Sequence, residues 1–380
     1  PEPGCAQAAP APDADKIAQA AQMINQAKRP ILYLGGGVVH SGASEAAVTL
    51  AEQASLPTTM TLMALGAMPV DHPLSLGMLG MHGAPYTNLA LEECDLLIAV
   101  GARFDDRATG KVAAFCPNAA IIHIDIDPSE LDKIKTAHVG IAGDVGAVLA
   151  QLLPQVQASL REDWNQRVAQ LKAERPLQLP GLDDPRSHYG LVQAVADALD
   201  DSAFVATDVG QHQMWVAQAY PLRRPRQWLT SGGLGTMGFG LPTAIGAALA
   251  NPERTVVCFS GDGSILMNIQ EFATLAEAGL NVKVVLMNNA SLGLVHQQQE
   301  LFYGERIFAS RFIAQPDFLQ IARGFRIAEL DLDAAADPRA ALKQALNAPG
   351  PCLIHASIDV KEKVYPMVPP GAANKEMIGG

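Results

Sequence analysis

The stretch 255–289 has the pattern of a strand, a glycine-rich turn, a helix and a second strand. An apolar, β-branched run leads into Gly-Asp-Gly-Ser at 261–264, and a second apolar run ends in Asn288 and Asn289. Glycines allow a tight turn, and the helix N-terminus that follows favours an anion such as a diphosphate. Mg²⁺ prefers oxygen ligands, such as the Asp262 carboxylate and an asparagine amide. We therefore expect one βαβ unit to hold Mg²⁺ and a diphosphate at the carboxyl edge of a parallel sheet.

Gly-Asp-Gly by itself is an ordinary turn sequence. The paired asparagines at the end of the next strand make the pattern much more specific. Together, 261–263 and 288–289 resemble the thiamine diphosphate (ThDP) signature, which begins Gly-Asp-Gly and ends Asn-Asn after a spacer of this length. We therefore interpret the stretch as a ThDP site.

Composition argues against several classes of function. The chain has 380 residues, 49% of them apolar, with a net charge of −12 and a pI of about 5.2. An acidic chain is a poor partner for nucleic acid or an anionic membrane. Neither a signal peptide nor an apolar run of ~18 residues is present, so we expect a cytoplasmic protein. The cysteines, mostly in apolar runs, predict buried thiols in a reducing compartment: Cys5, Cys94, Cys116, Cys258 and Cys352.

Before residue 153, helical patterns alternate with short apolar runs. This alternation is typical of a parallel, doubly wound α/β sheet that is buried on both faces. The patterns predict strands at 31–34, 57–61, 96–101 and 121–126, and helices at 15–27, 44–54 and 87–93. We therefore expect a first α/β domain over 15–153.

Glycines and charged residues lie where these strands are expected to end, which is where doubly wound sheets bind ligands. Glycines with arginines suit a nucleotide diphosphate, and an acidic residue at a strand end suits ribose hydroxyl groups. A turn glycine or a surface ion pair explains any one of these residues, but together they predict a nucleotide site. No clean Gly-x-Gly-x-x-Gly is present, so NAD is not favoured and the nucleotide is left open. The residues are Gly35, Gly36, Gly37, Thr61, Met63, Gly101, Arg103, Asp105, Arg107, Asp125 and Asp144.

A second α/β domain is predicted over 187–363. Strands are expected at 204–210, 255–260, 284–289 and 352–356, with helices at 189–199, from 211 and at 244–250. Five glycines between 232 and 242 allow the backbone to approach a ligand closely. His212 at a helix start has two interpretations, a catalytic residue or a group that donates to an anion or satisfies a loop.

The remaining segments are predicted to be linkers and a tail. Residues 1–14 are rich in alanine and proline and begin without Met, so we expect a linker whose preceding part is missing. A helical pattern at 151–173 is followed by several prolines and predicts an interdomain linker over 154–186. The proline-containing segment 364–380 is expected to be a surface arm.

Three stretches together, 103–107, 230–242 and 261–289, resemble the large catalytic subunit of the acetohydroxyacid synthase family, also called acetolactate synthases. The likeness runs from about residue 15 to the end and is closest to the bacterial isozyme I type. It implies a central FAD-binding domain and a C-terminal ThDP-binding domain, without the family's N-terminal pyrimidine-binding domain. The implied reaction joins two 2-oxo acids with loss of CO₂ in isoleucine, valine and leucine biosynthesis. Two pyruvates give acetolactate, and pyruvate with 2-oxobutyrate gives acetohydroxybutyrate.

The resemblance assigns roles to the residues that match. Asp262 and Asn289 would bind Mg²⁺ through their side chains, and Ser291 through its backbone carbonyl. Met237 would support the bent form of ThDP. The other implied contacts are to ThDP from Gly210, Gln211, His212, Gly235, Gly261, Gly263 and Ser264, and to FAD from Gly35, Gly36, Thr61, Met63, His82, Gly101, Arg103, Asp105, Arg107, Asp125 and Asp144. FAD is expected to do no net redox chemistry.

Two departures from the family pattern affect what this chain can do. The activating glutamate of the family lies in the absent domain and comes from the partner subunit, so we expect this chain alone to be inactive. Gln298 stands where most members have a tryptophan that favours 2-oxobutyrate, which predicts a weak acceptor preference. The alternative for Gln298 is a solvated helix residue.

Two other functions are kept as alternatives. Another ThDP and FAD enzyme, such as a pyruvate oxidase, would need FAD to be reduced by substrate. A non-catalytic nucleotide-binding module would not bind ThDP with Mg²⁺. The resemblance further implies a homodimer or higher oligomer and a small regulatory subunit.

Overall fold

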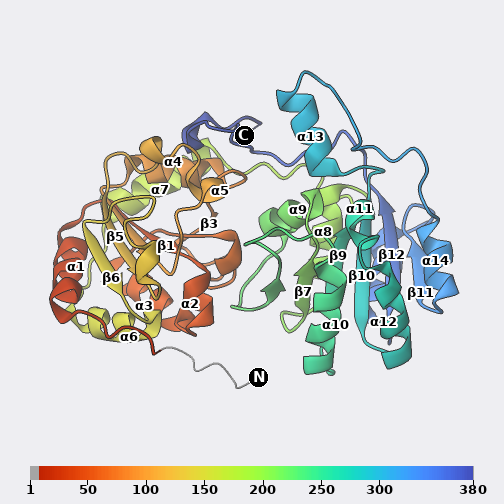
Figure 1. The fold of residues 1–380 in the computed structure, drawn as a ribbon, viewed down its shortest axis with the longest axis horizontal. Helices are drawn as coiled ribbons and strands as arrows, with labels where there is room; N and C mark the ends of the chain where they lie inside the picture. Colours follow the sequence, from red (N-terminus) through yellow and green to blue (C-terminus); the bar gives the residue numbers. More distant parts are fainter. Residues whose placement is uncertain (1–7, 380) are drawn as a thin grey trace. The chain divides into compact units, whose positions relative to one another are not determined.

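The computed structural model describes residues 8–379, and these divide into two compact units. Unit 1 is formed by 8–178, 223–225 and 365–379, and unit 2 by 179–222 and 226–364. The chain therefore passes between the units four times. Each unit contains one six-stranded parallel sheet with helices packed on it, which confirms the predicted fold class (Figure 1).

The sheet of unit 1 has the strand order β3-β2-β1-β4-β5-β6, and every pairing in it is parallel. This is the order of a doubly wound dinucleotide-binding fold, in which the direction of winding reverses between β1 and β4. The carboxyl ends of these two strands therefore frame the expected ligand crevice. The strands are β1 (Pro30–Leu34), β2 (Thr58–Met60), β3 (Ser75–Met78), β4 (Leu96–Val100), β5 (Ala120–Asp125) and β6 (Val139–Ala142).

Helices cover both faces of this sheet because alternate strand residues are apolar on each side. On β1, Leu32 and Leu34 pack with the helices of one face, whereas Ile31 and Tyr33 pack with those of the other. The first face is covered by α1 (Ala14–Gln26), α2 (Gly36–His40), α3 (Ser44–Ala54) and α6 (Val145–Leu152). The second is covered by α4 (Pro85–Glu93), α5 (Asp106–Thr109) and α7 (Glu162–Glu174).

The single helix predicted at 151–173 is wrong, because two helices separated by an irregular segment occupy this part of the chain. Helix α6 ends at Leu152, a 3₁₀ turn at Leu153–Gln155 follows, and α7 begins only at Glu162. Pro154 has no backbone N–H to continue a helix, and Arg161 adopts a φ of 44°. Helix α7 packs in unit 1 through buried Trp164.

The sheet of unit 2 has the order β11-β12-β10-β9-β7-β8, again with parallel pairings. The winding reverses between β7 and β9, so the ligand crevice is expected at their carboxyl ends. The strands are β7 (Phe204–Thr207), β8 (Trp228–Leu229), β9 (Val256–Gly261), β10 (Val282–Asn288), β11 (Ala328–Asp331) and β12 (Cys352–Ser357).

The helices of unit 2 follow the strands as the alternating pattern predicts. The helical run expected after 264 is broken, however, into the four-residue α11, a 3₁₀ turn at Ile269–Glu271 and α12. The helices are α8 (His188–Asp197), α9 (Gln211–Ala219), α10 (Gly240–Ala250), α11 (Asp262–Ile265), α12 (Phe272–Ala278), α13 (Gly293–Phe302), α14 (Phe318–Gly324) and α15 (Pro338–Asn347).

The C-terminal segment is not the surface arm that its prolines suggested. Residues 365–379 belong to unit 1, and Met367 and Val368 in this segment are buried. Burial of these apolar side chains favours a packed segment over an extended arm. Figure 1 shows this dark blue segment beside α4 and α5.

The structure also bears on the cysteines and on membrane-spanning helices. Cys94, Cys116, Cys258 and Cys352 are free, buried thiols as expected, and Cys5 lies outside the described residues. Within 8–379, none of the helices has the length and apolar character needed to cross a membrane.

Candidate cofactor sites of the two units

The predicted ThDP residues of unit 2 meet at the point where the winding of its sheet reverses. Gly210 precedes α9 at the end of β7, and Gly261 ends β9 directly before α11. Asp262 begins α11, and Asn289 follows the neighbouring strand β10, whose Met287 pairs with Gly261. The βαβ unit therefore places the predicted metal ligands at one edge of the sheet, as its sequence indicated.

Asp262 is the best candidate for a metal ligand. Asp262 is only 2% exposed, and burial raises the pKa of its carboxyl group to about 6. Oδ2 accepts hydrogen bonds from the Ser291 amide at 3.0 Å and from Gln315 Nε2 at 2.6 Å. Asn289 donates from Nδ2 to Gln211 Oε1 at 2.9 Å, which orients its amide. A buried carboxylate and an oriented amide suit a hard divalent cation, whose charge would offset the cost of burying the carboxylate.

His212 and two glycines form a cradle beside these residues. A Cβ at Gly210 would lie 2.7 Å from Cε1 of the imidazole ring, and one at Gly261 would lie 3.0 Å from its Nδ1. Burial lowers the pKa of His212 to about 3, so the ring is neutral, and its buried Nε2 has no partner within the described part of the chain. A polar ligand would satisfy this nitrogen, so the cradle fits the diphosphate end of a cofactor. Ser264 Oγ donates to Val209 O at 2.8 Å, which ties α11 to the same edge.

The loop that carries Gly235 and Met237 is held by a residue that the sequence analysis missed. Buried Asp208, at the end of β7, accepts a hydrogen bond from the Gly238 amide at 2.7 Å. Asn268 Nδ2 donates to the Gly238 carbonyl at 2.6 Å, so the backbone after Met237 is fixed from both sides. Burial raises the pKa of Asp208. An acidic residue directly after a buried strand is the sequence signal that could have identified it.

In the described part of the chain, the structure does not link Gln298 to the predicted ThDP residues. It lies half-buried on α13, between two glutamines whose side chains hold neighbouring backbone. Gln297 exchanges hydrogen bonds with both backbone groups of Val364, and Gln299 donates to Phe308 O at 2.9 Å. Over 8–379, no hydrogen bond links Gln298 to another predicted site residue. Its proposed role in acceptor choice therefore stays a prediction.

The predicted nucleotide residues of unit 1 also gather at one sheet edge, around the reversal between β1 and β4. A Cβ at Gly35, directly after β1, would lie 2.1 Å from Gly101 O, after β4. Gly101 has a φ of 56°, so glycine is required for both the close approach and the conformation. Thr61 follows β2, and its buried Oγ1 has no partner among the described residues. The close glycines and the unsatisfied hydroxyl fit a bound nucleotide such as FAD.

The charged and polar residues of this group have mixed settings. Asp105 and Asp144 cap α5 and α6 through their side chains, so each has a structural role whatever it binds. Asp125 ends β5, is buried, and lies 4.0 Å from His123 Nε2. His82 is buried beside Pro366 O at 3.0 Å from its Nδ1, and burial lowers its pKa to about 4. Exposed side chains complete the group at Met63, Arg103 and Arg107.

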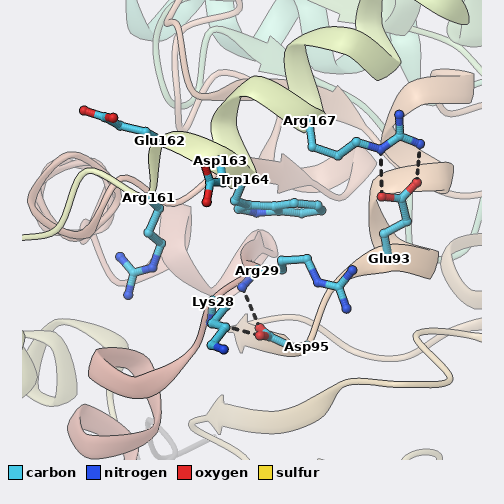
Figure 2. Close-up of a pocket in the computed structure, with 9 residues that line it drawn as sticks. All are labelled: Lys28, Arg29, Glu93, Asp95, Arg161, Glu162, Asp163, Trp164 and Arg167. Carbon is cyan, nitrogen blue, oxygen red and sulfur yellow. Dashed lines mark hydrogen bonds and ion pairs between the residues drawn. The ribbon is translucent and has the colours of Figure 1, made fainter.

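A separate cavity in unit 1 is not part of either predicted site. It has a volume of about 800 Å³, and Figure 2 shows its charged lining beneath α7. Arg167 and Glu93 form a two-point ion pair at 2.6 and 2.9 Å. The Arg161 guanidinium donates to backbone carbonyls at the ends of α1 and α3, so it satisfies helix ends. We therefore interpret this cavity as space left where α7 packs on the rest of unit 1, and not as a ligand site.

Comparison with known protein families gives two matches, one in each half of the chain. Residues 17–152 match the central domain of thiamine pyrophosphate enzymes, and 208–356 match their C-terminal TPP binding domain. The chain belongs to the thiamine pyrophosphate enzyme family. The central-domain match contains the whole sheet of unit 1, and the C-terminal match covers the part of the unit 2 sheet that follows β7.

Curated relatives narrow the class. The chain is 64% identical over 372 residues to acetolactate synthase isozyme 1 large subunit of Escherichia coli K12, which covers 98% of the chain and 66% of that relative. It is 47% identical over 364 residues to the isozyme 2 large subunit of the same organism, which covers 96% of the chain and 66% of the relative. A large subunit from Parasynechococcus marenigrum is also 47% identical, over 96% of the chain and 59% of the relative. The chain thus spans less than two thirds of the length of these acetolactate synthase relatives.

Proposed function

We propose that this chain forms the cofactor-binding part of an acetolactate synthase large subunit. The complete protein would join two 2-oxo acids with loss of CO₂, giving acetolactate from pyruvate or acetohydroxybutyrate when 2-oxobutyrate is the acceptor. The observation that carries the proposal is the convergence of buried Asp262, oriented Asn289 and the unsatisfied His212 ring at one sheet edge, in a chain 64% identical to such a subunit.

In this proposal, unit 2 binds Mg²⁺ and ThDP. Asp262, Asn289 and the carbonyl of Ser291 would hold the metal. Bound ThDP supplies an electron sink for the loss of CO₂ from a 2-oxo acid. The protein would position the cofactor through the loop that carries Met237. Asp208 accepts from the Gly238 amide at 2.7 Å and Asn268 donates to the Gly238 carbonyl at 2.6 Å, and these two hydrogen bonds hold the loop. The remaining diphosphate contacts would come from Gly210, Gln211, His212, Gly261, Gly263 and Ser264, with Gly235 at the ring of the cofactor.

Unit 1 would bind FAD at the reversal between β1 and β4. The close approach of Gly35 to Gly101 and the unsatisfied hydroxyl of Thr61 support this assignment. The proposal also includes a homodimer or higher oligomer and a small regulatory subunit, which follow from the resemblance. It further includes a cytoplasmic location, which was expected from the composition of the chain. Gln298 is proposed to give the complete enzyme a weak preference between acceptors.

The test is acetolactate formation from pyruvate with ThDP, Mg²⁺ and FAD, measured with and without a separately made polypeptide covering the third of isozyme 1 that this chain does not match. We expect no activity from this chain alone and activity on mixing. Pyruvate-dependent bleaching of the flavin would instead indicate an oxidase. Failure of the chain to bind ThDP with Mg²⁺ would overturn the proposal in favour of a non-catalytic nucleotide-binding module.

A further inference from the structure

The C-terminal segment of unit 1 is attached to a loop after β3. The Val368 amide donates to Met81 O at 2.9 Å, and the carbonyl of Pro366 lies 3.0 Å from His82 Nδ1. A carbonyl can only accept, so the hydrogen of this imidazole is on Nδ1. The segment therefore fixes both the backbone and one side-chain tautomer of this loop.

The same segment is attached to a second loop, around α5. Asn374 is buried and donates from Nδ2 to Ala108 O at 2.9 Å, while Lys111 donates its amide to Ala372 O at 2.9 Å. Gly110, with a φ of 55°, leaves the space that Asn374 occupies, because a Cβ there would lie 2.7 Å from Asn374 Oδ1. The contact of Asn374 is buried, so water cannot replace it without a cost in free energy.

The two loops are also joined to each other. The Met81 amide donates to Arg107 O at 2.8 Å, and a Cβ at Gly80 would lie 2.3 Å from the same carbonyl oxygen. Three of the residues that the family resemblance implies as flavin contacts, His82, Asp105 and Arg107, lie on these loops. A segment that fixes both loops therefore fixes this part of the nucleotide site.

We propose that residues 366–374 are a positioning segment for the flavin site of unit 1. They hold the 80–83 and 105–111 loops in the conformation that binds FAD, without contributing the chemistry of the site. This inference rests on the flavin site proposed above. It assigns the final residues of the chain to the cofactor site of unit 1, where the sequence indicated only an exposed arm.

The test is FAD binding by the full chain, followed by quenching of flavin fluorescence, for wild type and two neighbouring variants. Asn374→Ala removes the donor to Ala108 O, and we expect its Kd for FAD to rise about tenfold, as for the loss of one buried hydrogen bond. Lys375→Ala removes only an exposed ion pair with Glu92, so its Kd should stay within twofold of wild type. Thermal melting of each variant reports whether the fold is kept.

A second measurement needs no variant. Hydrogen–deuterium exchange of the wild-type chain, with and without FAD, should show that FAD slows exchange of amides at 372–376 as well as at 35–37 and 101. The inference is overturned if Asn374→Ala binds FAD within twofold of wild type, or if FAD leaves exchange at 372–376 unchanged. A wild-type chain that binds no FAD would refute the flavin site itself, and with it the positioning role.

Discussion

Replacing Asp262 by Asn should stabilise the metal-free chain at pH 8 while removing its use of Mg²⁺. Burial raises the pKa of this carboxyl group from 3.8 to about 6, which corresponds to about 3 kcal/mol. The folded state holds the proton more tightly than the unfolded chain, so stability falls as the pH rises from about 4 to about 6 and the full cost is present above that range. Asn is neutral throughout, and its amide oxygen can take the place of Oδ2 and accept from both Ser291 and Gln315. Its Nδ2 then replaces Oδ1 and cannot accept from the backbone amides of 262 and 263 that stabilise the carboxylate, at a cost of about 1 kcal/mol.

The expected net gain is therefore about 2 kcal/mol at pH 8. Thermal melting of the EDTA-treated, ThDP-free chain should show it as a rise of a few degrees, since ~1 kcal/mol shifts a unit of this size by about 2–4 °C. At pH 5 the electrostatic cost falls to about half, so the advantage should shrink. Asp317→Asn is the matched control, because Asp317 is an exposed helix cap and Asn caps equally well. Calorimetry should show that Mg²⁺ no longer tightens ThDP binding to the Asp262 variant. A variant less stable than wild type at both pH values would refute the reasoning.

Three further predictions concern separate parts of the chain. Arg161→Ala should lower the free energy of unfolding of unit 1 by about 2–4 kcal/mol in urea denaturation, because it leaves helix-end carbonyls without donors, and an unchanged midpoint would contradict this. Gly210→Ala should weaken ThDP binding at least tenfold in a fluorescence titration, because its Cβ would displace the ring of His212; equal affinity would exclude that cradle as the diphosphate site. Gln298→Trp in the complete enzyme should increase acetohydroxybutyrate over acetolactate in a competition assay by about tenfold, as for one added apolar contact. An unchanged product ratio would favour a solvated helix residue.

The sequence predicted the interior of both sheets and missed their edges. All eight inner strands were expected, most of them from apolar runs, because a strand buried on both faces has a largely apolar sequence. The exception is β2, which was expected at 57–61 although it contains Thr58 and Thr59. The four strands without a prediction, β3, β6, β8 and β11, are the edge strands. An edge strand has one partner, and these four are short, two to four residues, or polar in part, as in Ala328–Asp331.

The candidate site residues were predictable where they lie at the ends of inner strands, and not where they lie in irregular segments. Residues at the ends of inner strands, such as Asp262 and Gly101, were identified because the topology of a parallel sheet brings strand ends together. Gln315 was missed although it donates to Asp262, since it lies 53 positions further along the chain in a loop without a regular pattern. The packing of Asn374 against Ala108 was missed for the same reason, with a separation of 266 positions.

The return of the chain to unit 1 at residue 365 has a consequence for the order of events during synthesis. A domain made of one continuous segment can finish folding while the rest of the chain is still being made. Unit 1 includes residues 365–379, which are translated after unit 2. Its loops at 80–83 and 105–111 therefore lack their contacts with this segment until unit 2 has been translated. We therefore expect a ribosome-bound chain stalled before residue 365 to have the sheet of unit 1 but not the ordered loops at its carboxyl edge.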